Sequence, residues 1–136
     1  MKQKKKQKKR GMTLLEIMVV ITLIGLVTAA IGVAVMNQLS KGQSDTARNQ
    51  AYEIGKSLEL YKLNNGRYPT TAEGLQVLVT PPKGKPLMDQ MPKDPWGNDY
   101  VYVNPGQKNP SKFDVRSKGP DSQEGTEDDV GNWAAE

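Results

Sequence analysis

The fold is decided by residues 11–36, which read GMTLLEIMVVITLIGLVTAAIGVAVM. The last 20 of these residues, 17–36, carry no charged side chain. At about 1.5 Å per residue, a helix of this length spans roughly 30 Å, the thickness of the hydrocarbon core of a bilayer. The run is longer than the apolar core of a secretory signal peptide, and its small residues 28–30 lie inside it rather than after it. We therefore expect a helix that spans a membrane.

A strongly basic segment precedes this run. Residues 1–11 contain seven Lys and Arg residues and no acid, whereas the rest of the chain has 12 bases and 15 acids. A run of bases is typical of a solvated or nucleic-acid-binding tail, but beside a membrane span it stays on the cytoplasmic side. We interpret it as a topology signal, with the bulk of the chain translocated and no nucleic-acid partner.

Composition excludes several function classes. The 136 residues contain no Cys and no His. Disulfide scaffolds, thiol nucleophiles, zinc sites of the Cys/His kind and Ser-His-Asp triads are therefore ruled out. A chain of this size with 6% aromatic residues is also too small for a large core with a deep pocket, so we expect no enzyme.

One acidic residue, Glu16, stands at the edge of the apolar run. An ionised carboxylate in a membrane costs about 2.5–3.5 kcal/mol on insertion scales, and such a group is functional by default. Either Glu16 lies shallow enough to reach the lipid headgroups, or a cation at the same depth neutralises it. The chain has no basic residue between Met12 and Lys41. A cut just before Met12 would supply a free α-amino group instead.

The helix is expected to continue to about Leu63. Five apolar residues recur there at spacings of 4, 3, 4 and 3, the stripe of an amphipathic helix: Ala47, Ala51, Ile54, Leu58 and Tyr61. Gly66 can end the helix in the left-handed conformation. Only this second half of the helix has a polar face, so only this half is predicted to pack on a soluble domain.

The remainder of the chain is rich in proline and predicts short elements. We expect a short helix over Glu73–Val79 and two strands over Asp99–Val103 and Lys112–Arg116, joined by a turn over Asn104–Ser111. The fold class is therefore α+β, with a long N-terminal helix packed on a small antiparallel sheet. The candidate sheet and core residues are Trp96, Tyr100, Tyr102, Phe113, Val115 and Trp133.

The segment from Pro120 to Glu136 contains six acids and no base. It is either a disordered acidic tail or a folded loop with turns at glycines and anchors at Val130 and Trp133. In a folded loop, Asp121 and the pair Asp128-Asp129 could converge on a hard cation such as calcium, which takes 6–8 oxygen ligands. Zinc is improbable without Cys or His, and the spacing is not that of an EF-hand.

The segment Gly11-Met12-Thr13-Leu14-Leu15-Glu16, between a basic leader and an apolar run, resembles the class III signal of type IV pilins and pseudopilins. The resemblance implies that a prepilin peptidase cuts between Gly11 and Met12 and N-methylates Met12. It also implies that Glu16 neutralises the N-terminal amine of a neighbouring subunit in the assembled filament. Met12 stands where most members of the family have Phe.

Later motifs narrow the resemblance to the major pseudopilins of type II secretion systems. They are Y-P-T-x-x-x-G-L at 68–75, D-P-W-G-x-x-Y at 94–100, and the calcium loop with the C-terminal segment over 117–133. The connection at 83–87 departs from the usual pattern. The resemblance implies calcium bound by the side chains of Asp121, Asp128 and Asp129 and by backbone oxygens including that of Lys118, whereas Glu124 and Glu127 have no assigned role.

The implied organisation has four segments: a leader, 1–11, that is removed; a transmembrane and assembly helix, 12–36; the amphipathic half of the helix, 37–66; and a small periplasmic region with the calcium loop, 67–136. The type IV pilin-like subunit would polymerise with itself into a periplasmic fibre on the inner membrane and drive folded proteins across the outer membrane. Its other implied partners are minor pseudopilins, the prepilin peptidase, the inner-membrane secretion platform and the outer-membrane secretin.

Two alternatives share much of this pattern. One is a type IV pilin of an adhesion or motility fibre, which has the same first part up to Met36. The other is a membrane-anchored calcium-dependent binding domain that never polymerises and does not need the cut after Gly11. The calcium loop in place of a Cys pair and the D-P-W-G motif favour the pseudopilin over the pilin.

Overall fold

The computed structural model describes residues 11–133, so of the predicted leader only Gly11 lies within the described residues. The elements are one long helix, one short 3₁₀ helix and three strands: α1 (Leu14–Asn65), η1 (Leu75–Leu78), β1 (Val101–Val103), β2 (Asp114–Ser117) and β3 (Val130–Gly131). The chain divides into two compact units between Leu39 and Ser40. The first unit contains the apolar part of α1, and the second contains everything that follows.

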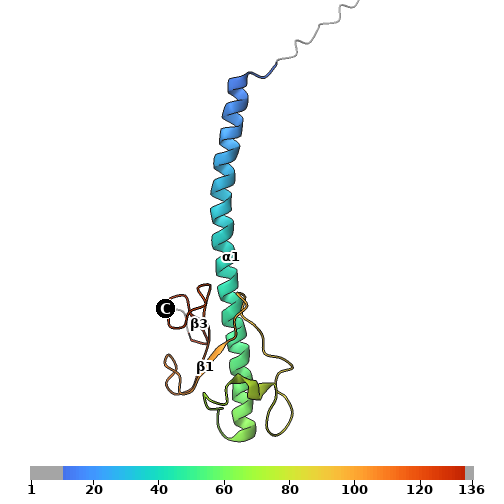
Figure 1. Ribbon diagram of the computed structural model, residues 1–136, viewed down its shortest axis with the longest axis vertical. Coiled ribbons are helices and arrows are strands. Elements are labelled where there is room, and N and C mark those ends of the chain that lie inside the picture. Colours follow the sequence, from blue (N-terminus) through green and yellow to red (C-terminus); the bar gives the residue numbers. More distant parts are fainter. Residues whose placement is uncertain (1–10, 134–136) are drawn as a thin grey trace, which may run out of the picture. The chain divides into compact units, whose positions relative to one another are not determined.

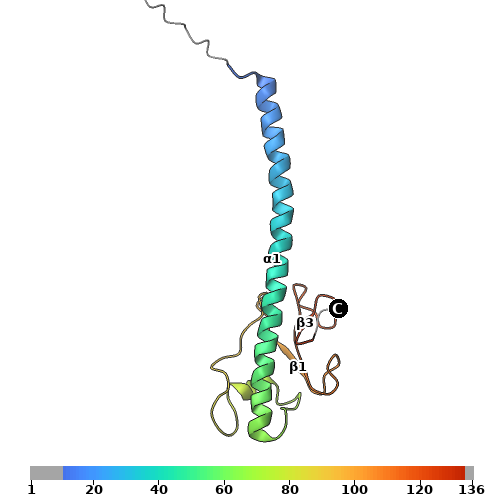
Figure 2. The same cartoon turned by 180° about the vertical axis from the view of Figure 1, so that it is seen from behind.

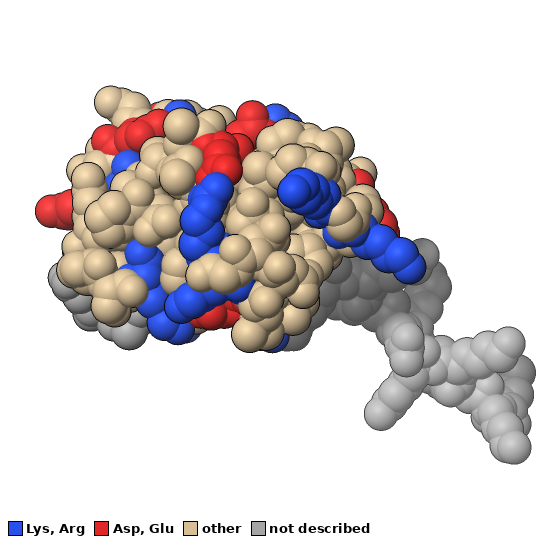
Figure 3. All heavy atoms as spheres, turned by 90° about the horizontal axis from the view of Figure 1, so that it is seen from below, with Lys and Arg blue, Asp and Glu red and all other residues tan. Residues whose placement is uncertain are grey.

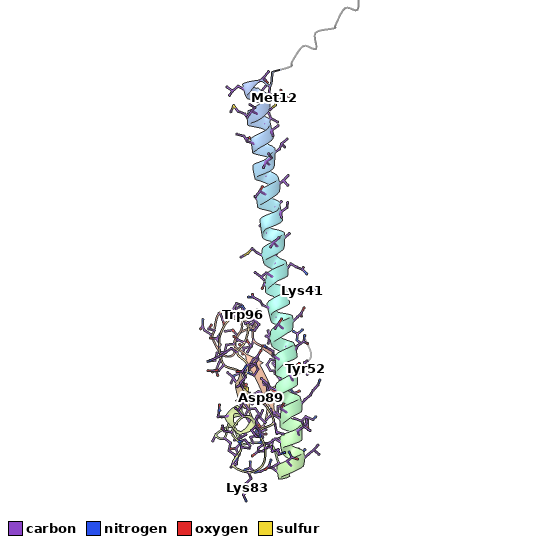
Figure 4. The ribbon with its side chains drawn as sticks, turned by 90° about the vertical axis from the view of Figure 1, so that its right-hand side faces the viewer. Met12, Lys41, Tyr52, Lys83, Asp89 and Trp96 are labelled. Atoms are coloured by element: carbon purple, nitrogen blue, oxygen red, sulfur yellow. The ribbon has the colours of Figure 1, made fainter. Side chains whose placement is uncertain are left out.

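In the first unit every described residue is exposed. Side chains radiate from all sides of α1 between Met12 and Lys41 (Figure 4). An 18-residue window of α1 has a mean hydropathy of 2.6 and is 0% buried, so by length and composition the helix can cross a membrane. The hydroxyl groups of Thr22 and Thr28 donate to the carbonyls of Met18 and Ile24, which satisfies them within the helix.

The second unit has a hydrophobic core built on the predicted stripe of α1. All five stripe residues are buried there: Ala47, Ala51, Ile54, Leu58 and Tyr61. The strands and loops lie along the same C-terminal part of α1 when the molecule is seen from either side (Figures 1 and 2). Tyr100, Tyr102, Phe113 and Val115 pack against the stripe, which confirms four of the six core candidates. Trp96 and Trp133 are only partly buried.

The sheet is antiparallel throughout, in the order β1-β2-β3. Tyr102 pairs with Val115 between β1 and β2, and Ser117 pairs with Val130 between β2 and β3. The two predicted strands therefore exist, but with shifted bounds. The first starts later than expected because Asp99 forms only an isolated bridge with Lys93. The second starts at Asp114 instead of Lys112 and ends one residue later, at Ser117. The third strand was not predicted, since two residues are too few to show an alternating pattern.

The predicted helix end and turn have clear causes. Gly66 has φ of 79° and donates its N–H to the carbonyl of Lys62 at 2.7 Å, which ends α1 as expected. The predicted turn over Asn104–Ser111 closes around the buried carboxylate of Asp114. That carboxylate accepts three backbone N–H groups at 2.6–2.9 Å, from Gln107, Lys108 and Asn109.

Only part of the predicted helix over Glu73–Val79 forms, as the four-residue η1. Gly74 has φ of 65° and ψ of −167°, which is outside the helical region and separates Glu73 from the helix. Glu73 belongs instead to a preceding turn. Its carboxylate accepts the N–H of Thr70 at 2.7 Å, and its own N–H donates to the Thr70 hydroxyl at 3.2 Å. This reciprocal pair has the hydrogen-bond pattern of a capping box, but it closes a turn and not a helix.

Two tyrosines tie the sheet to the rest of the second unit. The Tyr100 hydroxyl lies 2.7 Å from Gln50 Oε1 and 3.2 Å from the carbonyl of Ala47, both on α1. The Tyr102 hydroxyl donates to the carbonyl of Pro69 at 2.7 Å. Burial raises the pKa of Tyr102 to about 12.

The surface of the second unit carries both signs of charge. On the face seen in Figure 3, basic and acidic side chains are interspersed rather than gathered by sign. Examples of exposed ion pairs are Lys93 with Asp99 at 2.6 Å and Lys112 with Glu59 at 2.9 Å. Such pairs contribute little to stability, so we attribute the fold of this unit mainly to its core and its buried hydrogen bonds.

Candidate functional site

The amino end of α1 carries the residues predicted for processing and assembly. Gly11, Met12 and Thr13 are exposed and precede the first helical residue. The bond between Gly11 and Met12, at which cleavage is predicted, therefore lies outside the helix. Glu16 is exposed in the first helical turn.

Glu16 also forms a capping box that the sequence analysis missed. The N–H of Thr13 donates to Glu16 Oε2 at 3.4 Å, and the N–H of Glu16 donates to the Thr13 hydroxyl at 3.2 Å. The signal was present in the spacing T-x-x-E before an apolar run. In the uncut chain, therefore, Glu16 interacts with the start of its own helix, where the negative charge also suits the helix dipole.

The acidic loop between β2 and β3 is folded and held by hydrogen bonds. Asp128 Oδ1 accepts the Thr126 hydroxyl at 2.6 Å, and Asp128 Oδ2 accepts the N–H of Asp121 at 3.3 Å. Gly119 has φ of 66°, and a Cβ at that position would lie 2.5 Å from the Asp128 carbonyl oxygen. Only glycine permits this close approach to Asp128, and the backbone N–H of Asp121 also lies against the Asp128 carboxylate.

Asp129 is a largely buried acid of the loop, with a side chain 7% exposed. Its Oδ2 accepts the N–H of Gly125 at 2.8 Å and lies 3.8 Å from Arg116 Nε. Its Oδ1 is buried and has no hydrogen-bond partner. A buried carboxylate oxygen without a partner is costly, and a cation would satisfy it.

The predicted ligand atoms have the right chemistry for a hard cation, but the structure does not gather their side chains around one point. The ligands implied by the resemblance are all oxygens, which calcium prefers. Within residues 11–133, however, no three acidic side chains are gathered closely enough to form a metal cluster. Asp121 Oδ1 instead accepts the N–H of Gln123 at 2.8 Å. The calcium ligands Lys118, Asp121, Asp128 and Asp129 therefore stay a prediction.

Basic side chains from β2 and its end meet the acidic loop. Glu124, which had no role in the sequence analysis, is paired with Lys118 Nζ at 3.1 Å and with Arg116 at 3.4 Å. The hydrogen bond with Lys118 lowers the pKa of Glu124. The Lys118 side chain is thus paired with Glu124, while the predicted ligand of this residue is its backbone carbonyl oxygen.

A cavity of about 830 Å³ lies beside this loop. Arg48, Arg116 and Asp129 all contribute to its wall. Arg48 Nε, Arg116 Nε and Asp129 Oδ1 are buried without a hydrogen-bond partner. Because the cavity presents both signs of charge, we do not assign it a ligand of its own.

The D-P-W-G turn supports the acidic loop, a role that the sequence analysis did not foresee. Asp94 is 4% exposed, and its Oδ1 accepts the N–H groups of Trp96 at 3.1 Å and Asn98 at 2.7 Å. Its Oδ2 accepts the hydroxyl of Ser117, the last residue of β2, at 2.6 Å. An Asp that starts a turn indicates the first two bonds, but no sequence signal indicates the third.

Two family models match the chain. The model described as type II secretion system protein G matches residues 34–133, and the prokaryotic N-terminal methylation motif matches residues 6–32. The first match covers most of the chain. The chain belongs to the protein G family of type II secretion systems. The second match includes Gly11, Met12 and Glu16.

Curated relatives of the same family match this chain over most of their length and of its own. Type II secretion system core protein G of Escherichia coli K12 is 43% identical over 135 residues, covering 93% of this chain and 92% of that protein. The same protein of Pectobacterium carotovorum is 42% identical, covering 93% and 85%. That of Pseudomonas aeruginosa is 38% identical, covering 94% and 97%.

A solved structure agrees as well. The crystal structure of the major pseudopilin from the type 2 secretion system of enterohaemorrhagic Escherichia coli superposes with a TM-score of 0.63 at 36% identity, covering 72% of this chain and 92% of that one. The predicted resemblance to major pseudopilins and the predicted fold class are therefore confirmed, with the calcium loop set apart as untested. The family also decides against the type IV pilin of an adhesion or motility fibre.

Proposed function

We propose that this pseudopilin is a structural subunit that polymerises through the apolar part of α1 into a periplasmic fibre and so drives folded proteins across the outer membrane. The observation that carries the proposal is the exposure of residues 17–36, which carry no charged side chain and whose side chains lie on all sides of the helix. A soluble monomer rarely exposes such a surface. A membrane covers it before assembly, and neighbouring helices cover it in the fibre.

In the fibre, Glu16 neutralises the N-terminal amine of an adjacent copy. Removal of the leader after Gly11 creates that amine at Met12, only four residues from Glu16. An unpaired carboxylate among packed apolar helices is strongly unfavourable, whereas a paired one is tolerated and sets the register between subunits. Assembly therefore transfers Glu16 from its own capping box with Thr13 to a neighbour.

Electron microscopy of cells that overproduce the chain tests this proposal. Glu16→Ala should still be cut, giving a mature N-terminus at Met12 by mass spectrometry, but should form no fibres. Glu53→Ala is the matched control, because Glu53 is an exposed acid on the polar face of α1. Fibres of normal length from the Glu16→Ala variant would contradict the assembly role. Fibre formation by uncut chains would contradict the role of the new amine.

The remaining features of the proposal follow from the family and the charge pattern. Residues 1–11 are the cytoplasmic leader that the prepilin peptidase removes, and the domain from 67 onward faces the periplasm. The inner-membrane platform, minor pseudopilins and the secretin of the outer membrane are the partners expected for such a subunit. The role is structural and not enzymatic, which agrees with the naming of its relatives as pseudopilins.

The acidic loop is proposed to hold calcium through the side chains of Asp121, Asp128 and Asp129 and the carbonyl of Lys118. The buried, unpartnered Oδ1 of Asp129 supports this proposal. So does the approach of Asp128 to Gly119. A bound cation stabilises a loop that has a two-residue strand and no disulfide, since it binds only the folded form. Its role is structural, closing the C-terminal segment onto the sheet.

Thermal unfolding with and without a calcium chelator tests the loop. At a calcium concentration 100 times Kd, the ion stabilises the folded state by about 2.7 kcal/mol, so chelation should lower Tm by several degrees. Asp129→Asn should abolish the difference, while Glu127→Gln, a change at an exposed acid of the same loop, should keep it. A wild-type Tm that neither chelator nor added calcium changes would contradict the site.

A further inference from the structure

We infer that Asp94 and Ser117 are positioning residues for the calcium loop, acting through the peptide bond between Lys118 and Gly119. The inference rests on the proposed calcium site and deepens it. It begins from a chain of three buried groups. The Ser117 hydroxyl donates to Asp94 Oδ2 at 2.6 Å, and the N–H of Gly119 donates to the Ser117 hydroxyl oxygen at 3.1 Å.

The direction of these hydrogen bonds is fixed by chemistry. A hydroxyl has a single proton to donate and otherwise accepts. The carboxylate of Asp94 can only accept hydrogen bonds, so the Ser117 hydroxyl is the donor of the bond between them. Because its one proton is used, Ser117 Oγ can only accept a further hydrogen bond, and it accepts the N–H of Gly119. Ser117 is 0% exposed and Asp94 is 4% exposed, so water does not compete for either group.

Anchoring the Gly119 N–H also orients the Lys118 carbonyl. The two groups belong to one planar trans peptide unit, in which N–H and C=O point in opposite directions. A hydrogen bond that directs the N–H toward β2 and the D-P-W-G turn therefore directs the Lys118 carbonyl oxygen away from them. That carbonyl is the backbone ligand proposed for the cation.

The same anchor controls Asp128. The backbone of Gly119 lies against Asp128, since a Cβ on Gly119 would be 2.7 Å from Asp128 Oδ2. A second contact holds the next residues of the loop: Asn98 Nδ2 donates to the Ser122 hydroxyl at 3.0 Å, and Ser122 has φ of 58°. The turn at 94–98 thus fixes the first part of the loop at one buried point and one exposed point.

Calcium affinity, measured by titration calorimetry on the full chain in detergent, tests the inference. Removing a group that orients a metal ligand lowers affinity by about tenfold to a hundredfold. We therefore expect Ser117→Ala to raise the calcium Kd at least about tenfold. Asp94→Asn should do the same, because it keeps the acceptor for Trp96 and Asn98 but places a donor where the Ser117 proton was accepted.

Asp114→Asn is the matched control. Asp114 is likewise buried and accepts backbone N–H groups, but those groups belong to the turn at 107–109 and not to the acidic loop. It should lower Tm in the presence of chelator and leave the calcium Kd unchanged. A merely structural role for Ser117 would instead lower Tm without changing Kd.

Amide hydrogen exchange at Gly119 provides a readout without calcium. In calcium-free protein the Gly119 amide should be protected in the wild type and should exchange faster in Ser117→Ala. Calcium binding of wild-type strength by Ser117→Ala, or unchanged exchange at Gly119, would overturn the inference while leaving the calcium site intact. Failure of the wild-type protein to bind calcium would overturn the calcium site and this inference together.

Discussion

The two halves of α1 differ in what covers their apolar side chains. Between residues 14 and 39 every side chain is exposed, whereas in the second half Ala47, Ala51, Ile54 and Leu58 are each 0% exposed. The same secondary structure therefore serves two purposes. The second half completes a domain within one chain, and the first half is available for a membrane or for other copies of the chain. Stability of the domain and stability of the assembly should accordingly depend on different residues.

The largest effect on the domain is expected from a change in the buried stripe. Leu58→Ala should reduce the free energy of unfolding of the second unit by about 2–5 kcal/mol, because it leaves a cavity in the core. Trp96 and Trp133 are the only tryptophans of the chain and both lie in this unit, so denaturant titration followed by tryptophan fluorescence measures it.

Val27→Ala is the matched change in the first half, where Val27 is 57% exposed. It should alter the unfolding of the second unit by less than about 0.5 kcal/mol. Equal losses in the two variants would remove the distinction between the halves.

The two reciprocal Thr–Glu pairs, at Thr13/Glu16 and Thr70/Glu73, provide a comparison of intermediate size. Thr70→Ala removes the hydroxyl that accepts the Glu73 N–H in a turn of the folded domain, and should reduce the unfolding free energy of the domain by about 1 kcal/mol. Thr13→Ala removes the corresponding hydroxyl at the start of α1 and should leave that free energy unchanged, with loss of helix only at the first turn. Hydrogen exchange at the two sites distinguishes local from global effects, and a loss of domain stability in Thr13→Ala would contradict the account.

Much of this organisation was predictable because it depends on hydrophobic period and turn chemistry. The stripe from Ala47 to Tyr61 and the stop at Gly66 were both predicted correctly. The roles of the two buried aspartates were not predicted. Asp94 bonds to Ser117, 23 residues away, and Asp114 closes a turn that no local sequence pattern indicates. The spacing of the acids likewise suggested that Asp121, Asp128 and Asp129 converge on one point. In the structure the Asp121 carboxylate instead accepts the N–H of Gln123 within the loop.

The smallest effect concerns pH and is confined to the second unit. A bidentate pair with Arg67, at 2.8 Å for both bonds, lowers the pKa of Glu73 from 4.5 to about 2. The unfolded chain therefore takes up this proton at higher pH than the folded chain does. The contribution of Glu73 is complete above pH 4.5 and is lost as the pH falls toward 2.

Glu73→Gln should flatten the dependence of Tm on pH within this window, with a modest change because the pair is solvent-exposed. Thermal unfolding at several pH values measures it, with Glu53→Gln as a control for the loss of one surface carboxylate. A slope identical to that of the wild type would show that the pair adds nothing to the stability of the domain.

The central claim is that copies of the chain cover the first half of α1, while the chain itself covers the second. The chain has no cysteine, so a single cysteine can be placed in either half and its reaction with a water-soluble maleimide measured in detergent-solubilised subunits and in sheared fibres. We expect Val27→Cys to react faster in detergent-solubilised subunits than in fibres, and Ala51→Cys to be protected in both. Equal reactivity of Val27→Cys in fibres and in subunits would contradict the account.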